Sequence, residues 1–510
     1  MIEMLALSPG CRTVSRKKHS ARRVVLSVLS AVAMLALAAC ADMSGIGSHA
    51  RLRDIGTQDL AAIDASANPM EKPVADTVNS QWWLAFGDAQ LNALVEQAIA
   101  GNPNLQSAQA RLARAMASTA LAEAADRPQV NGSLDLTLQK FSSTYIYPAP
   151  LGGSIQETGT LQLSGSWEID FFGKNRAALN AALGAVNAAA ADAAAARVLL
   201  ASNVARNYVQ WARLNEQLTV ARRTLAQRDE TLRLVRDRVS AGLDTRLELR
   251  QSEGGLPEAR QQIEALNEQI AISRHALDAL VGQPNASAAL APPTLVTLKT
   301  IALQPALPVD LLGRRADVAA ARWRVEAATQ DVANARIQFY PNVNLVAFAG
   351  LQSIGFGNLL HSGSQQWGVG PAIRLPIFEG GRLRANLRGK NADLDAAIES
   401  YNATVLDAVR DAADQVSSAQ SITRQQVEQR SAQAAAEGAY EIAVQRYRAG
   451  LGNYLNVLTA ETSVLLQRRQ AVDLAARALD TQIGLARALG GGWQPSVAPA
   501  FTGIVGATVQ

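Results

Sequence analysis

The sequence is poor in residues that bind metals or form disulfides. Its 510 residues include two Cys and four His. So few ligands, spread over the whole length, favour neither a disulfide framework nor a metal site. Beyond position 40, no stretch reaches the roughly 18 consecutive apolar residues of a membrane helix. These scarcities speak against metalloenzymes. If the later chain spans a membrane, it must do so as strands.

Apolar residues are nevertheless abundant, at 48% of the chain against 5% aromatic residues. This content is enough to bury cores, and it excludes a disordered protein. The net charge of +4 and the pI near 9.1 would suit a nucleic-acid partner. However, residues 1–39 hold six Lys and Arg but one acidic residue, which leaves 42 basic and 43 acidic residues in the remainder. We therefore expect no nucleic-acid partner.

The N-terminal region has the pattern of a secretory signal. Basic residues precede an apolar run from Val24 to Ala39, which is too short to be a good membrane span. The run ends in Leu37-Ala38-Ala39-Cys40, which resembles the lipobox of bacterial lipoproteins. The resemblance implies a signal peptide at 1–39, an acylated Cys40 that carries palmitate-type chains, and a lipid-anchored tether at 40–80. An ordinary signal with a chance Cys is the alternative. Ala41 resembles the residue found in lipoproteins forwarded to the outer membrane.

The mature chain contains an internal duplication. Residues 100–282 align with residues 313–491 at offsets that drift from about 213 to 206 to 209, as expected for one unit copied once. In this alignment Val239–Leu243 falls on Tyr447–Leu451. Each copy predicts a helix, two strands, a long helix, a turn and a helix. We expect a first repeat, a connector, a second repeat and a tail at 81–282, 283–312, 313–491 and 492–510.

The predicted long helices carry apolar residues at a seven-residue spacing, which favours supercoiled packing. The first copy has Val204, Trp211, Leu218, Leu225, Leu232, Val239, Leu249, Leu256, Ile263, Ile270 and Leu277, and the second has Leu451, Leu458, Leu465, Val472 and Leu479. A filamentous coiled coil is an alternative, but the intervening strands interrupt the heptads.

The predicted helix lengths add a constraint. A helix over residues 177–241 would be about 98 Å long, and one over 244–281 about 57 Å. A helix over 101–126, about 39 Å long, makes up the difference if it stacks end to end on the shorter one. Gly254, Gly255 and Pro257 predict a bend in the shorter helix.

Four segments between the helices predict strands. Residues 133–139, 161–169 and 366–375 alternate polar and apolar side chains, whereas the phase of 342–351 is ambiguous. About ten alternating residues suit a tilted transmembrane strand, but a soluble four-stranded sheet fits the alternation equally well. The lipobox and the long helices favour the membrane. Four strands cannot close a barrel, so this reading requires oligomerisation. The side chains expected to face a wet interior are Asp135, Gln139, Gln162, Ser164, Ser166 and Glu168.

Separated motifs carry a family resemblance. They are Gln81-Trp82-Trp83, Phe86-Gly87-Asp88, Leu91–Val95, Gly101–Leu105, Trp167–Gly173, Leu311–Val318, Leu375–Arg382 and Arg446–Gly450. In this order they resemble outer-membrane efflux lipoproteins of the TolC and NodT type, although Ala316 stands where that family usually has Pro. The resemblance implies an α+β membrane protein that forms a homotrimer. Four strands per protomer would give a twelve-stranded β-barrel, continued by a long α-helical periplasmic barrel.

The resemblance also assigns a role to the two predicted helix turns. Gly242 with Leu243, and Gly450 with Leu451, would form the periplasmic tip that docks an adaptor protein. Glycine suits the left-handed conformation that often ends a helix. Plain helix stops remain compatible with this sequence.

Gate residues follow from the same resemblance. Tyr447 matches the family tyrosine and Glu248 an acidic partner, so Tyr447 is expected to donate a hydrogen bond to Glu248 of the neighbouring hairpin. Gly452 stands where some members have an Arg. Asn456 and Thr459 fall on positions of acidic rings in relatives and are uncharged here, which leaves Leu455 as an apolar constriction.

These patterns predict a passive exit duct rather than an enzyme. No Ser/His/Asp set, phosphate-binding loop or carboxylate pair stands out, so we expect no cofactor and no metal; His49, His275 and His361 are interpreted as surface or packing residues. The family resemblance implies that this duct serves a tripartite pump in the outer membrane and conducts small toxic compounds or drugs outward, and it also implies the partners. Its expected partners are a periplasmic adaptor protein, an inner-membrane pump of the resistance-nodulation-division type and outer-membrane lipid. Alternatives are a type I protein-secretion channel and a structural periplasmic coiled-coil lipoprotein.

Overall fold

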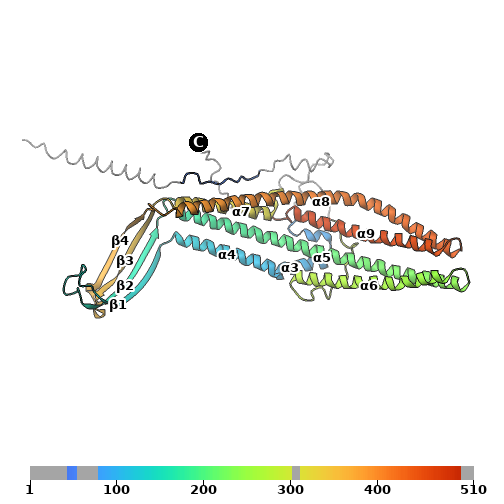
Figure 1. Cartoon of the computed structure of the whole chain (residues 1–510), viewed down its shortest axis with the longest axis horizontal. Coiled ribbons are helices and arrows are strands. Elements are labelled where there is room, and N and C mark those ends of the chain that lie inside the picture. Colours follow the sequence, from blue (N-terminus) through green and yellow to red (C-terminus); the bar gives the residue numbers. More distant parts are fainter. Residues whose placement is uncertain (1–42, 54–77, 301–310, 495–510) are drawn as a thin grey trace, which may run out of the picture. The chain divides into compact units, whose positions relative to one another are not determined.

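The computed structural model describes residues 43–53, 78–300 and 311–494 (Figure 1). The predicted signal peptide, Cys40 and most of the predicted tail lie outside the described residues. The chain divides into two compact units, and each takes segments from both predicted repeats. The first unit comprises 1–50, 118–183 and 326–396, and the second 51–117, 184–325 and 397–510. The repeat boundaries stay a prediction.

The described elements follow the predicted order of helix, strand, strand, long helix and helix in each copy. They are η1 (Trp82–Phe86), α3 (Ala89–Gly101), α4 (Pro103–Ala125), β1 (Gln129–Lys140), β2 (Ile155–Glu168), α5 (Lys174–Ser240), α6 (Arg246–Val281), η2 (Leu311–Arg314), α7 (Ala316–Ile337), β3 (Asn342–Ile354), η3 (Phe356–Asn358), η4 (Ser362–Ser364), β4 (Gln365–Arg374), α8 (Arg382–Arg448) and α9 (Tyr454–Ala488).

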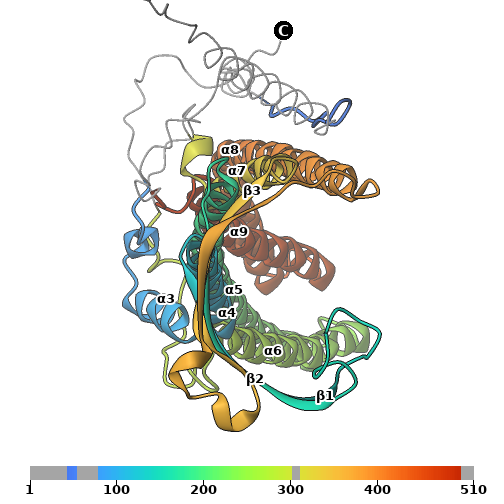
Figure 2. The ribbon, with the colours of Figure 1, turned by 90° about the vertical axis from the view of Figure 1, so that its left-hand side faces the viewer.

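The strands form one antiparallel sheet in the order β1-β2-β3-β4 (Figure 1). β1 pairs with β2, β2 with β3 and β3 with β4, and the strands bend along their length (Figure 2). Their 10 to 14 residues reach the length that a tilted transmembrane strand needs. Among residues 43–53, 78–300 and 311–494, no further strand pairs with β1 or β4 on its outer side, so this part of the sheet has two open edges.

The helix lengths agree with the length arithmetic. α5 and α8 have 67 residues each, which corresponds to about 100 Å. The predicted short helix begins only at Pro103, a first-turn position where the missing N–H of proline costs no intrahelical hydrogen bond. Asn102 caps it and donates its side-chain amide to the Leu280 carbonyl at 2.8 Å, so the ends of α4 and α6 meet as the stacking prediction requires. α6 continues through Pro257 as one helix.

Both copies bury only part of the seven-residue pattern. In the first copy, the half-buried positions are Leu225, Val239, Leu249, Ile263 and Ile270. Val204, Trp211, Leu232 and Leu277 are buried. In the second copy, Leu479 is buried, Leu458, Leu465 and Val472 are half-buried, and Leu451, in the turn before α9, is exposed. The buried stripe instead consists of Tyr454, Val457, Glu461, Val464 and Arg468. The search for apolar residues selected the neighbouring leucines because two of the buried positions hold the charged residues Glu461 and Arg468.

The aromatic motif at the start of the first repeat builds the core of the second unit. Trp82, Trp83 and Phe86 are buried against α3, α5 and α6. Asp88 caps α3 through the Leu91 amide and accepts the hydroxyl proton of Tyr208 at 3.0 Å. One window of α5 has a mean hydropathy of 1.3, a property of an alanine-rich helix that is weak evidence for a membrane span.

Candidate functional site

The strand register separates the sheet into a polar face and an apolar face. Residues directly opposite each other in an antiparallel pair lie on the same face, and the face changes at every residue along a strand. Asp135 is opposite Thr160, and Ser164 is opposite both Asn131 and Phe348. All six residues that the sequence assigned to a wet interior therefore share one face.

The register also fixes the phase of the third strand, which the sequence left ambiguous. Trp167 is opposite Leu345, which places Leu345 on the apolar face, and Asn344 falls on the polar face opposite Glu168. The apolar face carries the large exposed side chains Leu134, Leu136, Leu138, Leu161, Leu163, Trp167, Leu345, Trp367, Val369 and Ile373. A face of this composition suits lipid, and the opposite face suits a water-filled lumen.

The two predicted tip turns have the expected glycine geometry. Gly242 and Gly450 lie in the left-handed region, with φ of 72° and 75°. The Leu243 amide donates to the Arg238 carbonyl and the Leu451 amide to the Arg446 carbonyl, each at 2.8 Å, so both helices end in the same capped turn. Leu243 and Leu451 are exposed.

Near the tip, a polar latch forms on the α5 side of Tyr447. We define the tip latch as Arg238, Asp244 and Tyr447. The Tyr447 hydroxyl donates to the Asp244 carboxylate. Arg238 Nε donates to Asp244 at 2.9 Å, Arg238 NH1 donates to the Tyr447 carbonyl at 3.0 Å, and the guanidinium lies 4.6 Å from the centre of the tyrosine ring.

The tip latch is shielded by the apolar residues Val235, Tyr454 and Val457. Burial works against the charge of Asp244, but hydrogen bonds from Arg238 and Tyr447 outweigh it and hold the pKa of the carboxyl below its ordinary value of 3.8. Burial, together with the bond to Asp244, raises the pKa of Tyr447. The aspartate is therefore ionised and the phenol protonated at neutral pH, as this donor and acceptor pattern requires.

The expected bond from Tyr447 to Glu248 is wrong within the chain. Thr245 caps α6, and Glu248 closes a capping box by accepting from the Thr245 backbone amide at 2.9 Å. A carboxylate engaged at its own helix start is not available to Tyr447. The position of Glu248 is thus explained by local helix capping, and Asp244 takes the place that the sequence gave it.

The other predicted gate positions lie in the first turns of α9. Leu455 is 60% exposed. Asn456 and Thr459 are also exposed; the Asn456 amide donates to the cap residue Asn453, and the Thr459 hydroxyl donates to the Leu455 carbonyl. An exposed leucine between uncharged residues fits the predicted apolar constriction, which stays a prediction.

Sequence reasoning missed a second charge cluster near the tip. Arg228 of α5 donates to Glu461 of α9 at 2.8 Å, and also to Glu258 and the Gly255 carbonyl of α6, each at 2.8 Å. Glu461 is 9% exposed. This three-helix contact fixes α6 where the sequence breaks its helix pattern at Gly254 and Gly255. The sequence did contain a signal: Glu461 is seven residues from both Tyr454 and Arg468, so the three residues lie on one side of the helix.

The family signature around Arg315 has a structural explanation. Arg315 donates to Asp317 at 2.8 Å, to Asp411 of α8 at 3.3 Å and to the Ala488 carbonyl at the end of α9 at 3.2 Å. These bonds tie the start of α7 to two later helices. The motif therefore holds the second repeat together.

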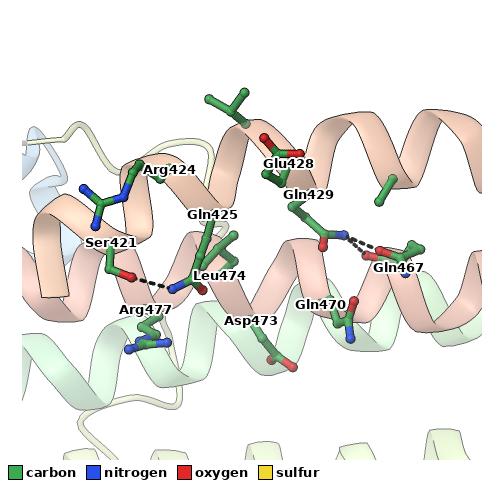
Figure 3. Close-up of a pocket in the computed structure, with 12 residues that line it drawn as sticks. Ser421, Arg424, Gln425, Glu428, Gln429, Gln467, Gln470, Asp473, Leu474 and Arg477 are labelled. Carbon is green, nitrogen blue, oxygen red and sulfur yellow. Dashed lines mark hydrogen bonds between the residues drawn. The ribbon is translucent and has the colours of Figure 1, made fainter.

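An open groove of about 940 Å³ runs between α8 and α9 (Figure 3). Among its polar side chains, Gln429 bonds Gln467 and Gln425 bonds Ser421, whereas Asp473 bonds Arg213 and Gln217 of α5. The groove contains none of the predicted tip, gate or lumen residues. Among residues 43–53, 78–300 and 311–494, no cluster of His, Cys, Asp or Glu is arranged to hold a metal ion. His49, His275 and His361 are exposed.

A two-faced sheet with open edges, joined to helices of about 100 Å that end in matching turns, defines an outer-membrane channel protein. A model of the outer membrane efflux protein family matches residues 94–283 and 307–491. The chain belongs to this family and forms an outer-membrane exit duct for efflux. The family is one of channels, not of enzymes.

Individual relatives agree. The chain is 39% identical over 369 residues to the fusaric acid resistance protein FusA of Burkholderia cepacia, covering 70% of this chain and 68% of FusA. It is 32% identical to the putative multidrug resistance outer membrane protein MdtQ of Escherichia coli K12, covering 90% and 97%. The crystal structure of the outer membrane protein VceC of Vibrio cholerae has a TM-score of 0.78 at 37% identity, covering 82% and 100%.

Proposed function

We propose that three copies of this chain form a lipid-anchored duct that passively conducts small toxic compounds or drugs out of the cell. The observation that carries the proposal is the four-stranded sheet, which has one polar face, one apolar face and two unpaired edges. Unpaired backbone groups are not tolerated in lipid, so copies must pair edge to edge until the sheet closes.

Strand direction supports this closure. Since β1 to β4 alternate in direction, β4 of one copy is antiparallel to β1 of the next when copies follow one another around a ring. Three copies give a barrel of twelve strands, with the polar face inside. The names of FusA and MdtQ support small toxic compounds as cargo and thus favour efflux over type I protein secretion. In the proposal, an adaptor binds the exposed tip and an energised resistance-nodulation-division pump supplies the work.

Two adjacent residues of β2 test the orientation of the barrel. Leu163 lies on the apolar face and Ser164 on the polar face. Leu163→Arg should prevent accumulation of trimers in the outer membrane, because arginine on the lipid side of a barrel costs about 2 to 4 kcal/mol at the bilayer midplane. Ser164→Arg should still give a particle of three chain masses by light scattering, with a measurable current in planar bilayers. A stable wild-type monomer, or no current, would contradict the proposal.

The lipid anchor has structural support in the described residues that follow Cys40. Asp395 of α8 accepts the hydroxyl proton of Ser48 and the amides of His49 and Ala50, at 3.0 and 3.1 Å for the amides. Asn402, two turns further along α8, bonds the backbone of Arg51 and Arg53. These contacts hold the chain against α8 a few residues after the proposed acylation site. Met43 is three residues from Cys40, a span of about 11 Å at most.

Acylation at Cys40 is tested by labelling. Cys40→Ser should abolish incorporation of a clickable fatty acid, because the serine hydroxyl does not replace the thiol in lipoprotein maturation. Cys11→Ser is the matched control and should leave labelling unchanged. Persistent labelling of the Cys40 variant would show that the lipobox match is accidental.

A further inference from the structure

Phe348 is an aromatic side chain on the polar face of the sheet. It lies in a row with Ser164 of β2 and Gly368 of β4. In the next row, Gln366 donates across Gly350 to Gln162 at 3.3 Å, so polar groups meet directly over β3. Phe348 is 37% exposed beside these polar groups. Exposure of a large ring where serine and glutamine are the neighbours needs an explanation.

The glycine opposite the ring accounts for its position. A Cβ atom built on Gly368 would lie 2.6 Å from the Phe348 ring, so the ring lies against the bare backbone of β4. In the following row Val346 is opposite Gly370, where a Cβ atom would meet nothing within 4 Å. Because Gly368 and Gly370 have no side chains, no β4 side chain covers the apolar residues Val346 and Phe348.

The same face also carries a negative charge. Asp135 shares a row with Thr160 and Gln352, so it lies two strands across from β3 and four residues along from Phe348, a separation of about 16 Å. Within the described part of the chain, no cationic side chain forms an ion pair with Asp135. The ring offers a contact to solutes that carry aromatic rings, and the carboxylate favours cations along the same wall of the lumen.

We propose that Phe348 is a solute-contacting residue of the barrel lumen that selects for aromatic organic cations. The inference rests on the proposed trimer, in which three Phe348 rings face one lumen. A solute that leaves through a purely polar tube would have to keep its apolar surface in water. The three rings offer that surface a contact midway along the polar wall.

Block of ion current in planar bilayers tests this role. Tetraphenylphosphonium is added on the β-barrel side of the full-length trimer, and tetramethylammonium serves as a probe of equal charge without rings. Phe348→Ser should raise the half-blocking concentration of tetraphenylphosphonium about tenfold, equivalent to about 1.4 kcal/mol. Phe348→Leu, which keeps apolar packing on Gly368, should raise it at least threefold. Block by tetramethylammonium should not change.

Trp367→Leu is the matched control. Trp367 is next to Gly368 in the sequence, but its side chain lies on the opposite, apolar face of the sheet. It should leave block by either cation unchanged. If Phe348→Ser does not assemble, the Leu variant alone decides. If both wild type and Phe348→Leu carry current and tetraphenylphosphonium blocks them at the same concentration, the proposed solute contact is wrong, but the proposed duct is not affected. Absence of current in the wild type overturns the proposed duct itself.

Discussion

Asp244→Asn is expected to loosen the tip latch and, in the proposed duct, to raise the open fraction of the channel by about ten- to a hundredfold. The carboxylate accepts hydrogen bonds from Arg238 and Tyr447 across the tip latch. A hydrogen bond to a charged group contributes about 1.5 to 3 kcal/mol, and about 1.4 kcal/mol is a tenfold change in an equilibrium. Asn keeps the size of the side chain but removes its charge. Single-channel recording in planar bilayers gives the open fraction directly.

Two variants separate the tip latch from a general loss of packing. Tyr447→Phe removes the tyrosine bond to Asp244 but leaves the two from Arg238, so it should give a smaller increase. Glu248→Gln replaces a carboxylate four residues away with an amide that still accepts the capping bond from Thr245, so it should leave the open fraction near the wild-type value. Equal opening by Glu248→Gln, or an unchanged current in Asp244→Asn, would refute the tip latch.

The tip latch also predicts the direction of a pH effect. Because the pKa of Asp244 is depressed in the closed state, its contribution is complete above about pH 4, where the free carboxyl is ionised, and is lost as pH falls through the depressed value. Wild-type current attributable to the tip latch should therefore rise only in strongly acid buffer. Asp244→Asn should show no such rise.

Arg228→Met should lower the free energy of unfolding by about 3 to 5 kcal/mol, because it leaves Glu461 buried without its partner. Glu461→Leu should cost less, since Arg228 retains Glu258 and the Gly255 carbonyl. The double variant should recover much of the loss, since apolar pairs of similar size often replace buried ion pairs without net cost. A double-mutant cycle is obtained from the denaturant midpoints of the wild type, the two single variants and the double variant, each followed by the circular dichroism of the helices.

An exposed ion pair near the same tip provides the comparison. Arg448 bonds Glu230 at 2.6 Å, but both side chains are more than half exposed. Arg448→Met should therefore change the midpoint little, because exposed pairs contribute about 0 to 1 kcal/mol. A large loss in Arg448→Met, or additive losses in the double variant of Arg228 and Glu461, would contradict the account of the buried cluster.

Sequence reasoning succeeded where a local rule decides the structure. Gly242 and Gly450 end their helices because glycine occupies the left-handed region without strain, which needs no knowledge of distant residues. The alternation in β1 and β2 assigned Asp135, Gln162 and the other lumen candidates to one face, because successive strand residues point to opposite sides. The repeated order of elements likewise follows from patterns within each copy.

The sequence by itself determined the duplicated order of helices and strands, the capped turns and the two-faced character of three strands. Only the tertiary structure decided the phase of β3, because its nearly uniform apolar run gains a face only from its register with Trp167 and Glu168 of β2. It also decided that Asp244, rather than Glu248, receives the Tyr447 hydroxyl, and that Glu461 is buried. The physical reason is common to these cases: a hydrogen bond or a buried charge depends on which side chain faces it across another element, and spacing along one segment does not contain that information.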